Sequence, residues 1–519
     1  MLAGSFQSVA IQLALALTLS AVGSAQQIPK SQEPGETVIE AGGQELPTFK
    51  SQHDLVLVPV VVRDKKGGHM KGLGKEAFQV EENGKQQDIT LFEEVRPVQE
   101  MPALPHADLG YSNLPLDSAH RQRLTILVLD LINTSPLQRA DARDQILKFV
   151  SNGLAPNQPV SVLCLTTRGL KQIQPFTMDQ KVLIDTLKKL SLGAETIIGH
   201  ENSVFMTIQQ LKEIGQSYGG IAGRKSMILA GAYLRELAID PGREISNTYQ
   251  LSLGDMAAAL INANIAVYPL ELLVGATDPT VGGLRSRAQD LFLKNFASDT
   301  GGNVCFESNG ANGCLMEAVE DSQSYYMLGF AVRPNDRKPG WRDLKVKVEG
   351  EHGDIEARGG FFYGKTEPQP NPDPKAARAD EVSALGSALP KSDVPMYVKV
   401  LGTAPATVTD GAHAREKKTT VSFRITVPLG GVKIDTSKTN PLDLEVGAIA
   451  ITSKTKEGGE ILHAVRGSPK PENLQAWRRY GIEIPEKIDL SAGSYDMRFF
   501  VHDMNGGQIG TVVFPLDVQ

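Results

Sequence analysis

Leu124-Thr-Ile-Leu-Val-Leu-Asp130, followed by Leu-Ile-Asn-Thr134-Ser135-Pro136, is the most informative stretch of this chain. A predominantly apolar run of this kind is typical of a strand that is buried on both faces of an α/β sheet. Ligands of such sheets bind beside the C-terminal ends of the parallel strands, and we call this end of the sheet the rim. Asp130 therefore marks a candidate ligand or metal site at the rim.

The sequence after Leu124 repeats this unit, with short apolar runs separated by amphipathic helical patterns. The expected strands are Leu124–Asp130, Val160–Thr166, Ser226–Ala230 and Ile265–Leu270, and the expected helices are Leu137–Asn152, Asp179–Leu190, Asn202–Tyr218 and Leu253–Asn264. Strands joined by helices need crossover connections, so we expect an α/β fold with a doubly wound, mostly parallel sheet. Helical patterns at Leu284–Ser298 and Leu315–Ser322 and a closing β segment at 325–363 are expected to complete this domain, residues 124–364.

Four segments are expected before this domain. Residues 1–25 contain no charged side chain and end in Gly23-Ser24-Ala25, which predicts a signal peptide and an exported protein, either periplasmic, envelope-associated or secreted. The alternative, a retained membrane anchor, would need a longer apolar run. Residues 26–53 predict a flexible leader, and 54–96 predict a small β module around the hairpin signal Asn83-Gly84. Residues 97–123 form a Pro-rich connection.

Two segments are expected after it. Prolines alternate with other residues from Pro368 to Pro374, so residues 365–390 predict a semi-rigid, exposed linker. Residues 391–519 contain about seven short strand patterns separated by turns, which is typical of a β-sandwich of immunoglobulin-like or fibronectin-like kind.

Composition and cysteine content limit the function further. The net charge of −7 is spread over interspersed acidic and basic residues, so no nucleic-acid partner is expected. No stretch after the first 25 residues approaches the length of a transmembrane helix, so no span is expected in the mature chain. Cys305 and Cys314 flank a Gly- and Asn-rich loop and predict a disulfide, whereas Cys164 lies in an apolar strand and predicts a core residue.

Asp130 has two interpretations when the motif is taken alone. With the hydroxyls of Thr134 and Ser135 it could supply oxygen ligands for a hard divalent cation. However, Ser135-Pro136-Leu137-Gln138 is also a capping box with proline in the first helical position, which accounts for Ser135 without a metal. Asp130 could likewise accept backbone N–H groups of the loop.

Several motifs, taken in order, resemble a known family. Asp130 at a strand end, a Thr in the loop Gly193-Ala-Glu-Thr196, and the strand at Arg224–Gly231 together look like a von Willebrand factor A domain. Residues 54–364 more specifically resemble the von Willebrand factor A-related family found mainly in acidobacteria. The motifs that carry this resemblance are Val60-Val-Val-Arg-Asp64, Phe78-Gln-Val-Glu-Glu-Asn-Gly84, Ile89-Thr-Leu-Phe92, Leu129-Asp-Leu-Ile-Asn-Thr134, Gln174-Pro-Phe-Thr177-Met-Asp179, Tyr325-Tyr-Met-Leu-Gly-Phe330 and Gly359-Gly-Phe-Phe-Tyr363.

The resemblance implies a metal-ion-dependent adhesion site in degenerate form. Asp130 matches its first ligand, Thr134 can stand for the third, and Thr196 matches the Thr of the second loop. Ile132 cannot replace the second ligand, and Ala230-Gly231-Ala232 offers no carboxylate in the third loop. We therefore expect weak or absent Mg²⁺ binding, because a site with few ligands loses affinity with each one removed.

Enzyme motifs receive little support. Gly215-Gln-Ser217-Tyr-Gly219 matches the nucleophile elbow of serine hydrolases, but that elbow needs a strand before the Ser and a helix after it, and here the predicted order is reversed. Gly223-Arg-Lys225-Ser226 lacks the spacing of a phosphate-binding loop. The histidines show no zinc-site spacing.

The sequence thus predicts an exported, non-enzymatic protein that binds an unknown protein partner, or mediates adhesion, through the rim. The alternatives are a secreted serine hydrolase that uses Ser217 and a structural scaffold of a cell-envelope assembly.

Overall fold

The structure is a computed structural model that describes residues 55–96, 110–114, 124–154, 158–192, 200–221, 223–231, 247–270, 293–305, 311–332, 338, 340–350, 353–363, 373–406, 418–452 and 457–519. The predicted signal peptide and leader, residues 1–53, and Thr196 lie outside this part of the chain. Within it, no helix has the length and apolar character needed to cross a membrane.

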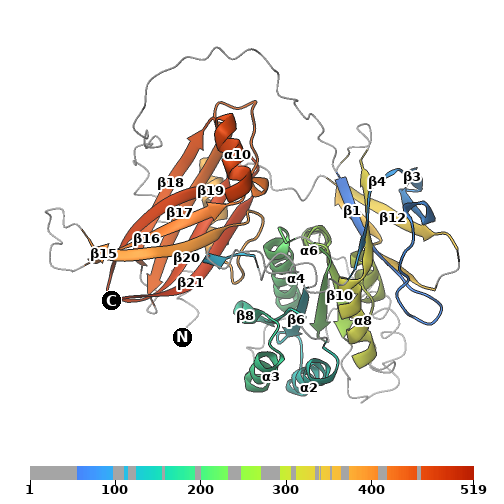
Figure 1. Ribbon diagram of the computed structural model, residues 1–519. Helices are drawn as coiled ribbons and strands as arrows, with labels where there is room; N and C mark the ends of the chain where they lie inside the picture. Colours follow the sequence, from blue (N-terminus) through green and yellow to red (C-terminus); the bar gives the residue numbers. More distant parts are fainter. Residues whose placement is uncertain are drawn as a thin grey trace, which may run out of the picture.

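A five-stranded sheet forms the centre of the α/β domain (Figure 1). Its strands are β6 (Thr125–Asp130), β7 (Val160–Thr166), β8 (Gly169–Thr177), β9 (Lys225–Ala230) and β10 (Ile265–Leu270), in the order β10-β9-β6-β7-β8. Four of these strands are parallel, and β8 is an antiparallel edge strand that the sequence analysis did not predict. The expected mostly parallel sheet is confined to this domain, because the other four sheets are antiparallel.

Helices cover both faces of this sheet. One face packs against α2 (Pro136–Asn152), α3 (Gln180–Lys189) and α8 (Ala311–Gln323). The other packs against α4 (His200–Tyr218), α6 (Asn247–Asn262) and a helix that includes residues 293–300. The strands are buried on both sides as their apolar sequences require, since each face has its own hydrophobic core.

The N-terminal strands form a β module together with residues 325–363. Its elements are β1 (Leu55–Val62), the short helix η1 (Lys75–Ala77), β2 (Phe78–Glu82), β3 (Lys85–Gln87), β4 (Ile89–Val95), β11 (Tyr325–Ala331), β12 (Gly340–Val348), β13 (Ile355–Ala357) and β14 (Gly360–Tyr363). They pair as two sheets, β13-β1-β11-β4 and β14-β12-β2-β3. The predicted hairpin is present, with positive φ at Asn83 and Gly84.

The expectation that residues 325–363 extend the α/β sheet is wrong. β11 lies between β1 and β4, and β12 pairs with β2, so these strands complete the module predicted at 54–96. Apolar periodicity predicts that a segment is a strand and which face it buries. It does not specify the partner strand, because any strand with a matching apolar face satisfies the pattern.

The C-terminal region is a β-sandwich of two antiparallel sheets that share one core. The strands are β15 (Tyr397–Pro405), β16 (Lys418–Val427), β17 (Leu442–Thr452), β18 (Glu457–Gly467), β19 (Ile482–Ser491), β20 (Gly493–Asp503) and β21 (Ile509–Val518), with η4 (Leu429–Gly431) and α10 (Pro471–Tyr480) between them. A short strand of the Pro-rich connection, β5 (Tyr111–Ser112), pairs with β15. The connection therefore contributes to the sandwich.

Part of the predicted linker 365–390 is a helix instead. α9 (Pro374–Gly386) begins at Asp373, whose carboxylate accepts a hydrogen bond from the Lys375 N–H at 3.0 Å, and Pro374 occupies the first turn. One side of α9 packs on the sandwich, where Leu385 contacts Ile449 and Phe500. An Asp-Pro pair in this position is a helix start, and the preceding alternating prolines concealed that signal.

Candidate functional site

Asp130 is the last residue of β6 and serves as a cap for the rim loop. The residue is 4% exposed. Its Oδ1 accepts the backbone N–H groups of Ile132 and Asn133 at 2.9 and 3.1 Å, and its Oδ2 accepts the Asn133 side-chain amide at 2.7 Å. Burial raises the pKa of Asp130, while the hydrogen bonds from Asn133 act in the opposite direction. Of the two interpretations of Asp130, this geometry is the capping one.

Asn133 links the rim loop to helix α4. Its amide nitrogen donates a second hydrogen bond to the Thr207 hydroxyl at 2.8 Å, and that hydroxyl donates to the Ser203 carbonyl at 3.1 Å. The end of β7 is fixed on the same helix, because the Gln210 side chain bonds both the N–H and the carbonyl of Thr166. The loops at the ends of β6 and β7 are therefore held by α4.

Arg139 brings a buried positive charge to the same loop. The guanidinium is on the first turns of α2, and the residue is 5% exposed. It donates to the Leu131 carbonyl at 2.6 Å and to the Thr134 hydroxyl at 3.3 Å, and its charge opposes the rise in the pKa of Asp130. The Thr134 hydroxyl in turn donates to the Asp130 carbonyl.

The capping box predicted at Ser135 is present. The Ser135 hydroxyl accepts the Gln138 N–H at 3.3 Å, and the Gln138 side chain accepts the Ser135 N–H at 2.9 Å. Pro136 occupies the first turn of α2. Ser135 is thus accounted for by helix initiation.

The rim residues that the structure describes do not fit Mg²⁺. Both Asp130 oxygens already accept hydrogen bonds, and the Thr134 hydroxyl oxygen accepts the Arg139 guanidinium at 3.3 Å. A divalent cation would also have to approach the buried guanidinium of Arg139, which would repel it. Ile132 packs against the core, and a Cβ at Gly231 would lie 2.8 Å from the Asp130 Cβ, so that position has no room for a ligand side chain. The described residues contain no cluster of three or more His, Cys, Asp or Glu that could hold a metal.

Ser217 is not placed for catalysis. It lies inside α4, is 0% exposed, and its hydroxyl has no hydrogen-bond partner in the described structure. A nucleophile elbow would present the hydroxyl at a strand-to-helix turn. The glycines of this motif serve packing instead, since a Cβ at Gly215 would lie 2.6 Å from the Ala259 carbonyl carbon of α6. This geometry gives no support to a hydrolase at Ser217.

Two large apolar side chains are exposed near the rim. Leu137, on the first turn of α2, is 78% exposed, and Phe205, on the N-terminal half of α4, is 42% exposed. Arg168 is exposed at the β7–β8 turn, where its N–H donates to the Thr166 hydroxyl at 3.2 Å. Sequence reasoning used Leu137 only as a helix start. Its position off the buried stripe of α2 was the available signal, because an apolar residue there has nothing to pack against.

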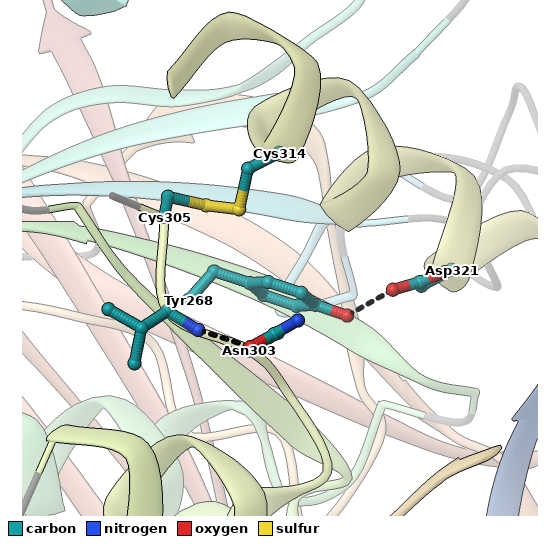
Figure 2. The surroundings of a disulfide bond; sticks show 6 residues. Tyr268, Asn303, Cys305, Cys314 and Asp321 are labelled. Atoms are coloured by element: carbon teal, nitrogen blue, oxygen red, sulfur yellow. Dashed lines mark hydrogen bonds between the residues drawn. A yellow bond between two sulfur atoms is a disulfide. The ribbon is translucent and has the colours of Figure 1, made fainter. Parts of the chain in front are cut away.

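The disulfide predicted between Cys305 and Cys314 is present and fastens α8 to the edge of the sheet. Cys305 forms a parallel β-bridge with Leu270, and its N–H donates to the Pro269 carbonyl at 2.9 Å. Figure 2 shows the disulfide beside Tyr268, whose hydroxyl donates to Asp321 of α8 at 2.6 Å. Cys164 is buried in β7, as expected.

Asp321 is the centre of a buried polar cluster that joins the α/β domain to the β module. It contacts Arg63 at 2.5 Å and His69 Nε2 at 3.0 Å, both from the module. Burial by itself would raise the pKa of Asp321, but His69 and the positive charges of Arg224 and Arg63 hold it below its usual value. The side chains of Asp321, Arg63 and His69 are largely buried, and the cluster joins two structural units.

No protein-family model and no curated protein matches the sequence. Solved structures with some similarity include an aerotolerance-related membrane protein from Bacteroides fragilis NCTC 9343 with multiple mutations to serines, at 13% identity over 38% of this chain and 98% of that one, with a TM-score of 0.24. The SpRpn10 VWA domain is 10% identical over 36% of this chain and 87% of that one, with a TM-score of 0.21. The TFIIH p34 N-terminal domain is 16% identical over 38% of this chain and 95% of that one, with a TM-score of 0.22. At these TM-scores the similarities define neither the family nor the function of the chain.

Proposed function

We propose that this protein is an exported protein-binding or adhesion module whose binding surface is the rim of the α/β sheet, and that binding does not depend on a metal ion. The observation that carries the proposal is the exposure of Leu137, at 78%, directly beside a loop held by the Asp130, Asn133 and Thr207 hydrogen bonds. Exposed apolar side chains on a rigid frame favour protein binding, because little conformational entropy is lost on association.

Metal independence is supported by the charges of the loop. In a metal-dependent site the cation neutralises the carboxylate and contacts the partner. Here Arg139 supplies the nearby positive charge, and the Asp130 oxygens face N–H donors of the loop. Contact with a partner is then left to Leu137, Phe205 and Arg168, where apolar and guanidinium groups are the types enriched in binding hot spots.

Export is supported by the Cys305–Cys314 disulfide, because such bonds persist in oxidising compartments. The uncharged, apolar N-terminal 25 residues support the same location.

The test compares rim variants with a matched control. Leu137→Asp and Phe205→Asp place a charge on the proposed surface, and Leu462→Asp does so on β18 of the sandwich, where Leu462 is 41% exposed. The immobilised full chain is exposed to an extract of the cell envelope and the medium, with EDTA and with MgCl₂, and retained proteins are identified by mass spectrometry. We expect a set of proteins that wild type and Leu462→Asp retain under both conditions and that both rim variants lose. Retention of the same set by the rim variants, with unchanged melting temperatures, would show that the rim is not the binding surface.

A further inference from the structure

A cleft of about 670 Å³ lies between the α/β domain and the C-terminal region. One wall is formed by α4 and α6, and the other by α9, the segment from Lys391 to Asp393 and the turn before β21. This volume lies within the range of pockets that bind small molecules. The cleft is lined by the C-terminal half of α4, whereas the rim loop contacts α4 at Thr207. It is therefore a separate site from the proposed protein-binding surface.

Direct contacts between the two regions fix the walls. The Ser392 hydroxyl donates to the Ser217 carbonyl at 2.6 Å and accepts the Gly220 N–H at 3.2 Å. The Glu213 carboxylate of α4 accepts the Ser387 hydroxyl at 2.7 Å and the Ala388 N–H at 3.1 Å. The cleft is thus preformed, so a ligand would not have to order its walls.

Small residues line the side of the cleft formed by α4 and α6. They are Gly215, Gly219, Ala258, Ala259 and Ala263. Because these side chains are short, the two helices approach closely and leave the space above them empty.

Two opposite charges face this space and attract each other without forming an ion pair, and the Glu213 carboxylate also attracts the ammonium of Lys391. Lys391 and Asp393 both line the cleft, and within the described residues neither the ammonium nor the carboxylate has a hydrogen bond or an ion pair. Lys212 and Asp255 at the same cleft are already paired, at 3.2 Å. Asp393 Oδ1 lies only 2.9 Å from the place that a Cβ of Gly219 would occupy, so the glycine leaves room for the carboxylate.

Unpaired charges in a partly buried position are costly. Burial raises the pKa of Asp393 to about 6 and lowers the pKa of Lys391, the expected response of groups that lack full compensation. A ligand that carries both complementary charges would remove this cost for both residues at once.

We propose that the cleft binds a small zwitterion that carries a primary ammonium and a carboxylate, with the ammonium on Asp393 and the carboxylate on Lys391. A free α-amino acid and a short peptide share this chemistry. The volume of the cleft admits either an amino acid or a short peptide, and the experiment below distinguishes the two.

The test is calorimetric titration of the full chain with two kinds of probe. One arm uses the protein amino acids singly, and the other uses trialanine. For any probe that binds, the N-acetylated form, which lacks the ammonium, and the amide form, which lacks the carboxylate, are titrated in parallel. We expect binding of the zwitterion and at least tenfold weaker binding of both blocked forms, because each loses one charge-assisted contact.

Variants assign the contacts. Lys391→Met and Asp393→Asn should each weaken binding about tenfold or more. The controls Lys345→Met on β12 and Asp185→Asn on α3 change exposed residues that do not line the cleft, so they should bind as wild type does. The proposal is wrong if neither arm binds at millimolar concentration, or if binding is the same in wild type and in both cleft variants. Binding in the amino-acid arm alone or in the peptide arm alone supports the proposal and identifies the source.

Discussion

Arg139 places a positive charge beside the buried carboxylate of the rim loop. Its guanidinium spans the Leu131 carbonyl and the Thr134 hydroxyl, so it closes the loop from the α2 side, while Asn133 closes it from the α4 side. A buried charge is tolerated when its hydrogen-bonding capacity is satisfied. The hydrogen bonds of the loop are therefore supplied by its own residues and by the adjacent helices, and Asp130 has a positioning role.

This role gives a prediction for Asp130→Asn. The amide keeps the shape of the side chain but has one acceptor oxygen where the carboxylate has two. At least one of the N–H groups that donate to Asp130 therefore loses its acceptor. We expect a loss of about 1–3 kcal/mol in the free energy of unfolding. In thermal melts, millimolar MgCl₂ should leave the melting temperature of wild type and variant unchanged. A magnesium-dependent rise in wild type that Asp130→Asn removes would establish a metal site at the rim.

Asp393 predicts a dependence of stability on pH. Its pKa is raised from 3.8 to about 6 in the folded protein by burial, so between these values the folded state binds more protons than the unfolded state. The contribution of this carboxyl to stability is therefore fully present below about pH 4 and is lost as the pH rises through 6. Asp393→Asn should stabilise the protein at pH 7.5, by on the order of 1–2 kcal/mol, and give no such gain at pH 4.

Urea unfolding at both pH values measures this effect. Asp185→Asn, at an exposed position of α3, serves as the control and should show no gain that depends on pH. An equal gain at pH 4 and pH 7.5 for Asp393→Asn would mean that its stabilising effect does not come from removing a buried charge.

At the scale of the element, local signals were predictable and partner choice was not. The capping box of α2 and the turn at Asn83-Gly84 were correctly predicted, because the residues involved are close in sequence. The pairing of β1 with β11 could not be predicted, because Val60 and Tyr326 are brought together by packing and not by any local pattern. Arg139 was also missed, since a basic residue on a helix is usually solvated and nothing nearby indicates that this one is buried.

The disulfide gives a prediction for helix α8. Cys305 and Cys314 are 9 residues apart, and closing a loop of this length restricts the unfolded chain by about 2–3 kcal/mol. The double variant Cys305→Ser, Cys314→Ser should lose that amount of stability. Dithiothreitol should destabilise wild type to the same degree and leave the variant unaffected. Equal sensitivity of both proteins to the reductant would show that the bond does not stabilise the fold.

At the scale of the whole molecule, the structural units are not continuous segments of the sequence. The β module is completed by residues after the α/β domain, and the connection between these two units contributes β5 to the sandwich. Tyr111 of β5 stacks on Phe514 with a centroid distance of 4.0 Å. Composition indicated only a Pro-rich connection and not where it packs, because prolines are common both in linkers and in chains that run across another domain.

Asn113 is the residue that holds this crossing segment in place. It is 5% exposed, its amide nitrogen donates to the carbonyls of Lys391 and Val394 at 2.7 and 2.8 Å, and its oxygen accepts the Met396 N–H at 2.9 Å. The same segment, 391–396, forms a wall of the cleft and enters the sandwich. Asn113 therefore links the connection to the segment that forms a wall of the cleft and enters the sandwich.

Asn113→Ala should therefore act on the whole molecule. It removes the side-chain partner of the Val394 carbonyl and of the Met396 N–H, whereas the Lys391 carbonyl still accepts the Thr511 N–H at 2.9 Å. We expect a loss of about 2–4 kcal/mol. Because the lost bonds link the connection to the sandwich, the variant should unfold in two separate calorimetric transitions where wild type shows more closely coupled unfolding. The control Ser112→Ala removes two hydrogen bonds in the same segment, from the Ser112 hydroxyl to the Met396 carbonyl and from the Leu114 N–H to the Ser112 hydroxyl, and leaves the Asn113 side chain in place. It should lower the melting temperature with little change in the shape of the transition. If Asn113→Ala lowers the melting temperature and leaves the number and overlap of transitions unchanged, the crossing segment stabilises the sandwich without coupling it to the α/β domain.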